Sequence, residues 1–515
     1  MLKKNNGQLD VFDHMIFEKL IPKDHLLVRI ELIIDFSFVY DMVKEQYSAI
    51  GRGSKDPMMM VKIFLLEYLY RLSDVQVSKR AQTDIVFRWF LNLGINDPVP
   101  DDTTISHFRV NRLTAEHFES FFTDIVKKCI ALDLIKTNRF IIDSTDVAAN
   151  TNYPSEKNLA RSAFKKVMKE VSKFNEPLAK ELSAAIESEI DAAYEKSDKV
   201  SWRKHFEITQ KYLDLLYIRT YDELQDNEKY LEAFGLCYDL LFQYVNNTKD
   251  KIISIVDPDA RVAHKTPTKS KTGYKDHIII DEDSEIILAS VQTPFNTGDG
   301  KKLIELLEMT ETQVGLKPKE LSADKAYGET ENRAYLKDAK IIGNIAFYKE
   351  SSRKNQYLFK ISDFVFSADF NRVTCPNGNS TETYKIIHNK TTNRDMKKFQ
   401  FDPKLCGSCP LIRQCIHTLK NGKLQNKSRK LDVFLRYDAV LQDQARAATE
   451  EFTIAYNKRY KVERRFATLV RNHGLRRCRY LRLKGAKIHI TMANMACNII
   501  RMVNLLCPEK EMVTI

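Results

Sequence analysis

Hydrophobic positions across residues 1–135 recur at helical spacing, and polar caps divide them into several helices. Asp56, which a proline follows, is a typical start for the apolar run after it. Ser73 is a typical cap for the next segment, and Gly94 marks a break beyond it. We therefore predict a helical N-terminal domain over residues 1–135.

The last part of this helical region resembles a helix-turn-helix motif that reads DNA. A helix, a proline-containing break and a short polar helix within residues 101–113 follow one another. Arg109 and Arg112 are expected on the exposed side of the short helix, where they would contact DNA. The alternative is a plain helical bundle, because a single sequence specifies helix-turn-helix geometry poorly.

Two short apolar runs that are typical of buried strands each end in an acid. Residues 140–142 are expected to form a strand with Asp143 at its carboxyl end, and Asp146 competes locally for the same role. A later short strand ends at Asp324. Two apolar runs between them flank residues 281–285, which predicts a hairpin. Each acid is either a turn former or a ligand presented from a rigid strand.

Residues 155–250 interrupt the strand pattern with a helical one. They are rich in Ala, Glu, Lys and Leu and contain almost no Gly, so we expect a helical insertion with solvated faces and no chemistry. Strand, insertion, strands, helix and strand then follow in order. This order predicts an α/β fold, with a mixed sheet flanked by helices, over residues 136–345 and 436–515.

Residues 346–435 differ in composition from both neighbours and contain short strands, turns and basic residues. Cys375, Cys406, Cys409 and Cys415 lie here, and a CxxC pair with two further cysteines fits a tetrahedral zinc site. Such an ion would stabilise a segment too small and polar to hold a core of its own. The alternative is a set of buried free thiols.

Composition narrows the class of partner. The 515 residues carry a formal net charge of +12, which favours an acidic partner such as nucleic acid. The chain has no apolar run of about 18 residues and no signal-peptide pattern, so no membrane partner is expected. Nine cysteines without a secretion signal indicate a reducing compartment, and hence a cytoplasmic location.

Residues 456–487 form a strongly basic segment that contains about a dozen Lys and Arg and a single acid, Glu463. Tyr456, Arg459 and Glu463 share one face of the predicted helix. One interpretation is a surface ion pair between Glu463 and Arg459, worth a few tenths of a kcal/mol. The other is a carboxylate that holds a divalent cation where a polyanion binds.

Asp143, Asp324 and Glu463 thus stand out as three acids that only the fold could bring together. Carboxylates suit Mg²⁺ or Mn²⁺, and two such ions about 4 Å apart can activate a water or a 3′-hydroxyl for phosphoryl displacement. Three crowded carboxylates repel one another without metal, so the ions would be part of the site.

Five motifs occur in order along the chain: IIDSTDVAAN, GYKDH, TPFNTGD, SADKAYG and YNKRYKVERRF. Together they resemble the DDE transposases of bacterial insertion sequences, whose catalytic domain is ribonuclease H-like. The resemblance covers most of the chain. It implies that Asp143, Asp324 and Glu463 are catalytic Mg²⁺ ligands, and that Tyr456 and Arg459 belong to the Tyr-x2-Arg-x3-Glu pattern of the family.

The resemblance also implies which residues lie at the DNA. The family pattern expects a basic residue seven positions after the glutamate, where this chain has Val470 followed by Arg471. Either Arg471 or another nearby base replaces it, or that phosphate contact is absent. Tyr274, Lys275, His277, Asn296 and Asp299 are expected near the active centre. The residues expected to contact DNA are Tyr456, Arg459, Arg464, Arg471, Arg476, Arg477, Arg479, Lys275, Arg109 and Arg112.

The implied function is a transposase that binds the terminal repeats of its element, cuts DNA with Mg²⁺ and joins the freed 3′-hydroxyl to target DNA. Two alternatives are an inactive or domesticated relative that only binds DNA, and a metal-dependent nuclease without strand transfer. The three acids argue against a pure binding protein. The expected partners are double-stranded DNA and further copies of the chain, in a bacterial cytoplasm at the nucleoid.

Overall fold

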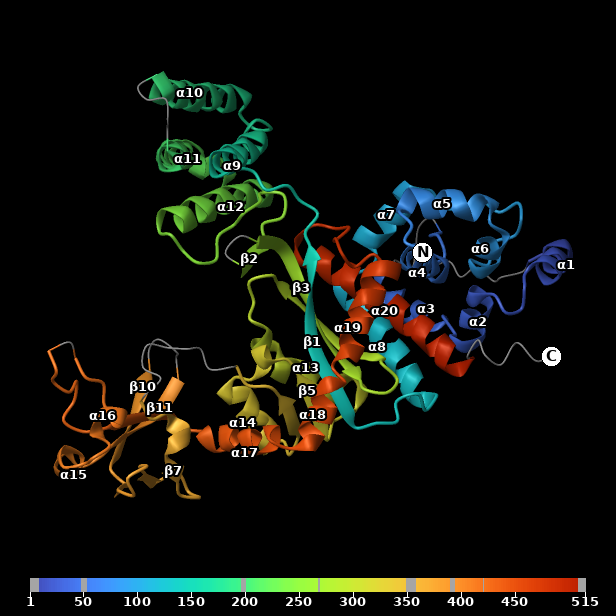
Figure 1. Ribbon diagram of the computed structural model, residues 1–515. Coiled ribbons are helices and arrows are strands. Elements are labelled where there is room, and N and C mark those ends of the chain that lie inside the picture. The colour runs from blue at the N-terminus through green and yellow to red at the C-terminus, as the bar shows by residue number, and fades with distance from the viewer. Residues whose placement is uncertain are drawn as a thin grey trace.

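Six strands, among the residues that the structure describes, form a mixed sheet at the centre of the molecule (Figure 1). The computed structural model describes residues 9–47, 53–195, 201–266, 269–348, 358–389, 394–419 and 421–507. The strands are β1 (Arg139–Ala148), β2 (Arg261–Thr266), β3 (Lys269–Asp281), β4 (Ile287–Pro294), β5 (Glu320–Ala323) and β6 (Ile342–Ile345).

The pairing of these strands defines the fold class. β3 pairs antiparallel with β1, β2 and β4, whereas β5 pairs parallel with β1 and with β6. β3 and β4 form the hairpin that the sequence predicts around residues 281–285. This arrangement confirms the predicted α/β fold with a mixed sheet flanked by helices, and it is consistent with a ribonuclease H-like catalytic domain.

Helices precede the sheet, as the sequence predicts. They are α1 (Val11–Leu20), α2 (Leu26–Ile33), α3 (Phe38–Val43), η1 (Lys44–Gln46), α4 (Pro57–Leu69), α5 (Asp74–Thr83), α6 (Ile85–Phe90), α7 (Asp102–Asn111) and α8 (Ala115–Ala131). Asp56 and Ser73 cap α4 and α5 through their side chains, as expected. The buried side chains of these helices form one continuous core with those of the sheet.

A second group of helices lies after β4 in the chain and flanks the sheet. It comprises η2 (Asp299–Lys302), α13 (Leu303–Val314), η3 (Lys325–Tyr327), α14 (Thr330–Asp338), α17 (Tyr437–Ala447), α18 (Glu450–Asn457), α19 (Tyr460–Asn472) and α20 (Arg482–Leu506). α20 packs against β3 and β4 on one side and against α2, α4 and α8 on the other. It therefore joins the N-terminal helices to the sheet.

Buried asparagines explain the polar positions within α20. Asn498 accepts from the backbone N–H of Ile287 (2.9 Å) and donates to its carbonyl (2.8 Å), close to an irregularity in the β3–β4 pairing. Asn494 donates to Asp276 on β3 (3.0 Å). These bonds satisfy polar groups inside the core, so α20 packs as a core helix in spite of its asparagines. No helix in the described parts of the chain is long and apolar enough to cross a membrane.

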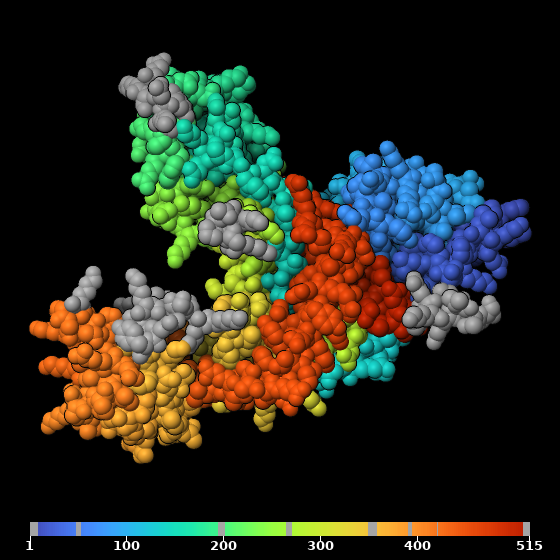
Figure 2. Space-filling view, viewed as in Figure 1, coloured from blue at the N-terminus to red at the C-terminus, as the bar shows by residue number. Residues whose placement is uncertain are grey.

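The helical insertion stands off the central body with a core of its own (Figures 1 and 2). Its helices are α9 (Glu156–Val171), α10 (Glu176–Glu195), α11 (Trp202–Leu224) and α12 (Glu228–Val245). The chain then returns through residues 251–260, which form an irregular loop ahead of β2. The buried carboxylate of Asp257 fixes this loop, because it accepts from the hydroxyl of Tyr274 and from the backbone N–H of Arg482 (3.1 Å).

The cysteine-rich region forms a second lobe on the same side of the body as the insertion (Figure 2). It has a small core of its own around Phe399 and Leu431. Its elements are η4 (Ile361–Asp363), β7 (Val365–Phe366), β8 (Val373–Thr374), β9 (Ser380–Thr381), β10 (Tyr384–Asn389), β11 (Arg394–Gln400), α15 (Pro403–Gly407), α16 (Ile412–Cys415) and β12 (Lys430–Phe434).

Arg109 on α7 is buried, so the prediction that it lies on an exposed helix face was wrong. Its side chain is 7% exposed and donates to Asp74 (3.0 Å) and to Glu67 (3.2 Å). Glu67 lies on α4, is fully buried, and also contacts the guanidinium of Arg479 (3.4 Å). Burial raises the pKa of Glu67 to about 8, against the lowering effect of Arg109 and Arg479. Arg109 therefore stabilises the fold and cannot reach DNA.

We predict that Arg109→Met lowers the free energy of unfolding by about 3–5 kcal/mol, because Glu67 and Asp74 lose the buried guanidinium that donates hydrogen bonds to both. Denaturant unfolding followed by circular dichroism measures this change. Arg112→Met is the matched control at the exposed end of the same helix, where the guanidinium donates to the carbonyl of Gln46 (2.7 Å). It is expected to cost about 1 kcal/mol or less. Equal effects of the two substitutions would contradict a structural role for Arg109.

Candidate active site

Asp143 and Asp324 lie next to each other where the parallel ladder of β1 and β5 ends. The last pair of this ladder is Ile142 with Ala323, so each aspartate is the following residue of its strand. Asp324 ends its strand as predicted. Asp143 does not, because β1 continues to Ala148 through its antiparallel pairing with β3. Asp143 is thus presented from the middle of a long strand, which holds its backbone rigidly.

The carboxylate of Asp143 is largely buried and has two hydrogen-bond donors. The guanidinium of Arg459 lies 2.9 Å from one oxygen, and the backbone N–H of Ser144 donates to the other at 2.8 Å. Burial raises the pKa of Asp143 to about 6, although Arg459 and the bond from Ser144 lower it. The negative charge of Asp324 raises this pKa further. A buried carboxylate with a second carboxylate beside it favours a bound cation.

Asp324 lies at the start of η3 and accepts from the backbone N–H of Lys325 (2.6 Å). The same short helix carries Tyr327, whose side chain is fully buried beside the acids. Burial raises the pKa of Tyr327, and the charges of Asp143 and Asp299 raise it further. Its hydroxyl makes no hydrogen bond of standard geometry within the described residues. The sequence alone gives no sign that Tyr327 is buried, because its burial depends on the packing of η3.

Glu463 is exposed in the first turn of α19, a helix that packs on β1 (Figure 1). The interpretation as a surface ion pair with Arg459 does not hold in the described structure, because Arg459 bonds to Asp143 instead. No group of three or more His, Cys, Asp or Glu among the described residues is placed to hold a metal ion. The structure therefore brings Asp143 and Asp324 together, and Glu463 as a third ligand stays a prediction.

A second polar group lies around Asp299, beside Asp143. Lys275 donates to Asp299 (2.7 Å), and so does the hydroxyl of Ser144 (2.9 Å). His277 pairs with Ser144 across β1 and β3, and its Nδ1 lies 3.9 Å from Asp299. Three of the residues that the resemblance placed near the active centre are thus close to Asp143: Lys275, His277 and Asp299.

Two other residues of that set lie elsewhere. Tyr274 is buried and donates to Asp257, in the loop that returns from the insertion. Asn296 donates to Asp250 (2.9 Å) in the same part of the chain. Both residues therefore contact the end of the insertion and do not contact the acids.

The predicted DNA-binding residues divide into paired and free side chains. Arg464 pairs with Glu285, and Arg479 donates to the carbonyl of Leu72 (2.7 Å) as well as contacting Glu67. The guanidinium of Arg459 lies over the ring of Tyr456 at 5.3 Å. The side chains that are exposed and form no ion pair or hydrogen bond within the described structure are Arg471, Arg476 and Arg477.

Val470 is half-buried and packs against the main core. Arg471, the next residue, is exposed. The loss of a basic residue at position 470 therefore adds apolar contact to α19, and Arg471 presents the nearest free guanidinium.

The four cysteines of the second lobe line one small cavity of about 30 Å³. Backbone bonds form tight turns at Cys375 and Cys406, each of which accepts through its carbonyl from a residue three positions later. Burial raises the pKa of the Cys415 thiol to about 11, while Arg429 lowers it. Within the described part of the lobe, no three of these thiols are close enough together to share an ion.

Adjacent aspartates on parallel strands of a mixed sheet are a donor set that suits a divalent cation, the cofactor of many enzymes that act on phosphodiesters. Two family models match the chain: Transposase domain (DUF772) over residues 15–111 and Transposase DDE domain over residues 248–499. The second match contains Asp324 and Glu463, whereas Asp143 lies between the two. Curated proteins and solved structures gave no match.

The two matches together cover more than half of the sequence, and the chain belongs to the DDE transposases of the insertion-sequence type. Transposases act on DNA, and DDE transposases generally use a divalent metal such as Mg²⁺.

Proposed function

We propose that this transposase binds the terminal repeats of its own element, cuts the DNA there with Mg²⁺ or Mn²⁺, and joins the freed 3′-hydroxyl to target DNA. The observation that carries the proposal is the juxtaposition of Asp143 and Asp324 at the end of the β1–β5 ladder. A mere DNA-binding protein gains nothing from two adjacent carboxylates beside a basic helix, because they repel phosphate.

The residues present fit a divalent cation. Asp143 and Asp324 offer neighbouring carboxylate oxygens, and burial raises the pKa of Asp143, which disfavours its charged form unless positive charge is near. Arg459 supplies part of that charge. We place Glu463 as the third ligand, because it follows Arg459 by one helical turn on the helix that packs on β1. The bound metal would activate the attacking oxygen and stabilise the leaving one.

Other side chains hold this centre in position. Asp299 accepts from both Lys275 and Ser144, which fixes the segment of β1 whose backbone N–H binds Asp143. Arg471 lies exposed at the end of α19, where it can bind a phosphate of the DNA. These contacts orient the carboxylates and the DNA without taking part in bond breaking.

The N-terminal helices are the proposed reader of the element ends. Arg112 is exposed at the end of α7, whereas Arg109 is withdrawn into the core. Two ends must be handled together, so we further propose that the chain acts as a homo-oligomer on DNA, in the bacterial cytoplasm at the nucleoid. We keep the domain division that the sequence predicts. In it, the helical insertion and the cysteine-rich lobe both interrupt the catalytic domain.

We predict that Asp324→Asn abolishes DNA cleavage and leaves DNA binding within about twofold of wild type. The amide keeps the shape of the side chain but loses the charge that binds the cation. Gel analysis of DNA that carries the native flanks of the gene, incubated with Mg²⁺, measures both properties. Asp239→Asn, at an exposed aspartate on α12, is the matched control and should cleave like wild type.

Three outcomes of this assay separate the candidate functions. Unchanged cleavage by Asp324→Asn contradicts the assignment of the site. Cleavage by the wild type without joined products identifies a nuclease without strand transfer. Binding without cleavage at any Mg²⁺ or Mn²⁺ concentration identifies an inactive relative.

We also propose a structural Zn²⁺ held by Cys375, Cys406, Cys409 and Cys415. The support is that all four thiols line one cavity in a lobe with a small core, where a thiolate-bound ion adds stability. Binding requires the thiols to move together around this cavity.

Elemental analysis of protein purified without chelators is expected to give about one zinc per chain. Cys409→Ser is expected to lose most of that zinc, because a hydroxyl is a poor substitute for a thiolate. Cys507→Ser, at an exposed cysteine after α20, should retain it. The absence of zinc from the wild-type protein would rule out the site.

A further inference from the structure

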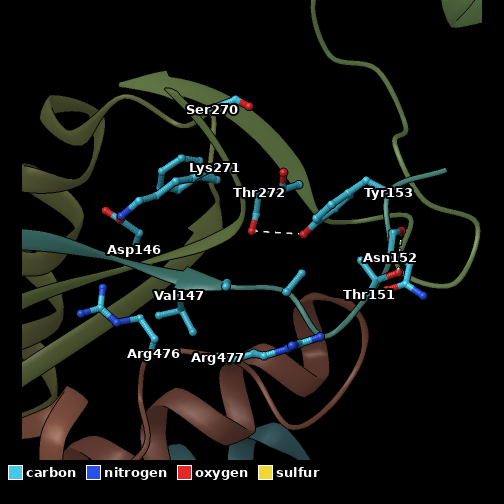
Figure 3. A pocket seen from close by; sticks show the side chains of 13 residues that line it. Asp146, Val147, Thr151, Asn152, Tyr153, Ser270, Lys271, Thr272, Arg476 and Arg477 are labelled. Atoms are coloured by element: carbon cyan, nitrogen blue, oxygen red, sulfur yellow. Dashed lines mark hydrogen bonds and ion pairs between the residues drawn. The ribbon is translucent and has the colours of Figure 1, made fainter. Parts of the chain in front are cut away.

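A cavity of about 600 Å³ lies at the C-terminal end of β1 (Figure 3). Its walls come from the end of β1, the segment that leads into the insertion, the beginning of β3 and the loop before α20. The residues that carry the argument are Tyr153, Phe295, Lys271, Asp146, Arg476 and Arg477. None of the functions above uses this cavity as a whole.

The cavity has an excess of fixed positive charge. Lys271 pairs with Asp146 across β3 and β1, so these two charges offset each other. Arg476 and Arg477 are exposed and have no side-chain partner within the described residues. Their backbone is locked to β1, because the N–H of Ala148 donates to the carbonyl of Arg476 (3.0 Å) and the N–H of Cys478 donates to the carbonyl of Ala148 (2.8 Å). Two unpaired guanidinium groups held in this way favour a phosphate.

An aromatic ring stands opposite these arginines. Tyr153 is 48% exposed, and its hydroxyl donates to the carbonyl of Thr272 (3.4 Å), which fixes the orientation of the ring (Figure 3). Phe295 is buried and adds an apolar part to the wall. An exposed ring beside free cations is the combination that binds single-stranded nucleic acid, in which base faces are available for stacking.

The cavity lies on the same strand as Asp143, within reach of one DNA strand. Ala148 follows Asp143 by five residues on the same strand, which places it roughly 17 Å away at about 3.3 Å per residue. A DNA strand covers that distance in about five nucleotides at the rise of a duplex, and in fewer when it is unstacked. A second cavity of about 400 Å³ adjoins the first and shares Arg477 with it. A strand held at Asp143 can therefore reach the cavity and continue beyond it.

We propose that this cavity receives an unpaired nucleotide of the DNA strand, with the base against Tyr153 and its phosphate on Arg476 and Arg477. The proposal rests on the proposed function in DNA cleavage and names the form of DNA that the site accepts near the cut. A paired base has both faces covered by its neighbours in the stack and would leave the ring of Tyr153 without a partner. The selectivity of the cavity is therefore for single-stranded over duplex DNA.

Fluorescence anisotropy without added metal tests the proposal, with a labelled oligothymidylate and a blunt duplex of the same length as probes. Tyr153→Ala is expected to weaken binding of the oligothymidylate by about fivefold or more, because one base loses its stacking partner. Binding of the duplex should stay within about twofold of wild type. Tyr153→Phe retains the ring but loses the hydrogen bond to Thr272, so it should bind the oligothymidylate more tightly than Tyr153→Ala does. Tyr221→Ala is the matched control, since Tyr221 on α11 is also 48% exposed.

The paired arginine substitution Arg476→Ala with Arg477→Ala supplies a second readout. It should reduce the salt dependence of oligothymidylate binding by a slope of roughly 0.7 for each phosphate that the protein no longer neutralises. Equal weakening of both probes in Tyr153→Ala, or unchanged binding of both, would overturn the proposal. These assays contain no metal and no cleavage step, so that outcome does not bear on the assignment of Asp143 and Asp324. Conversely, unchanged cleavage by Asp324→Asn does not bear on the binding result for the cavity.

Discussion

The parallel pairing of β1 with β5 is the constraint on which the rest of the site depends. It sets Asp143 and Asp324 side by side, although about 180 residues and the whole helical insertion separate them in the chain. Burial raises the pKa of Asp143, and the negative charge of Asp324 beside it raises this pKa further. Arg459 offsets part of this repulsion from the N-terminal end of α19. The geometry of the sheet thus favours the binding of positive charge where the β1–β5 ladder ends.

The surrounding architecture keeps that point rigid while leaving it accessible. α20 ties the sheet to the N-terminal helices through a common core, and buried asparagines on α20 satisfy polar groups of β3 and β4. The insertion and the cysteine-rich lobe each have a separate hydrophobic core, so neither shares the core that supports the acids. The basic loop before α20 is anchored to the end of β1 by backbone hydrogen bonds. β1 therefore holds Asp143 and also anchors the backbone of the nearest free arginines.

The sequence predicted much of this from local signals. Short apolar runs, a hairpin and capped helices identified the sheet, and the strand-end position of Asp324 is as predicted. Non-local pairing produced the differences. β1 extends past Asp143 because β3 pairs with it, and β3 is far away in sequence. Arg109 is buried because it pairs with Glu67, an acid within the apolar helix α4. Glu67 lies 42 residues earlier in the chain. The spacing of these two residues in the sequence does not predict that they pair. The same holds for the pair of Arg459 and Asp143.

The central claim is that Asp143, Asp324 and Glu463 hold the same metal ions. Electron paramagnetic resonance of Mn²⁺ bound to the protein with element-end DNA tests this claim most directly. Asp143→Asn, Asp324→Asn and Glu463→Gln should each reduce bound Mn²⁺ by about tenfold or more, because each removes a ligand from one shared site. Full Mn²⁺ binding by Glu463→Gln, with loss in both aspartate variants, would contradict this claim.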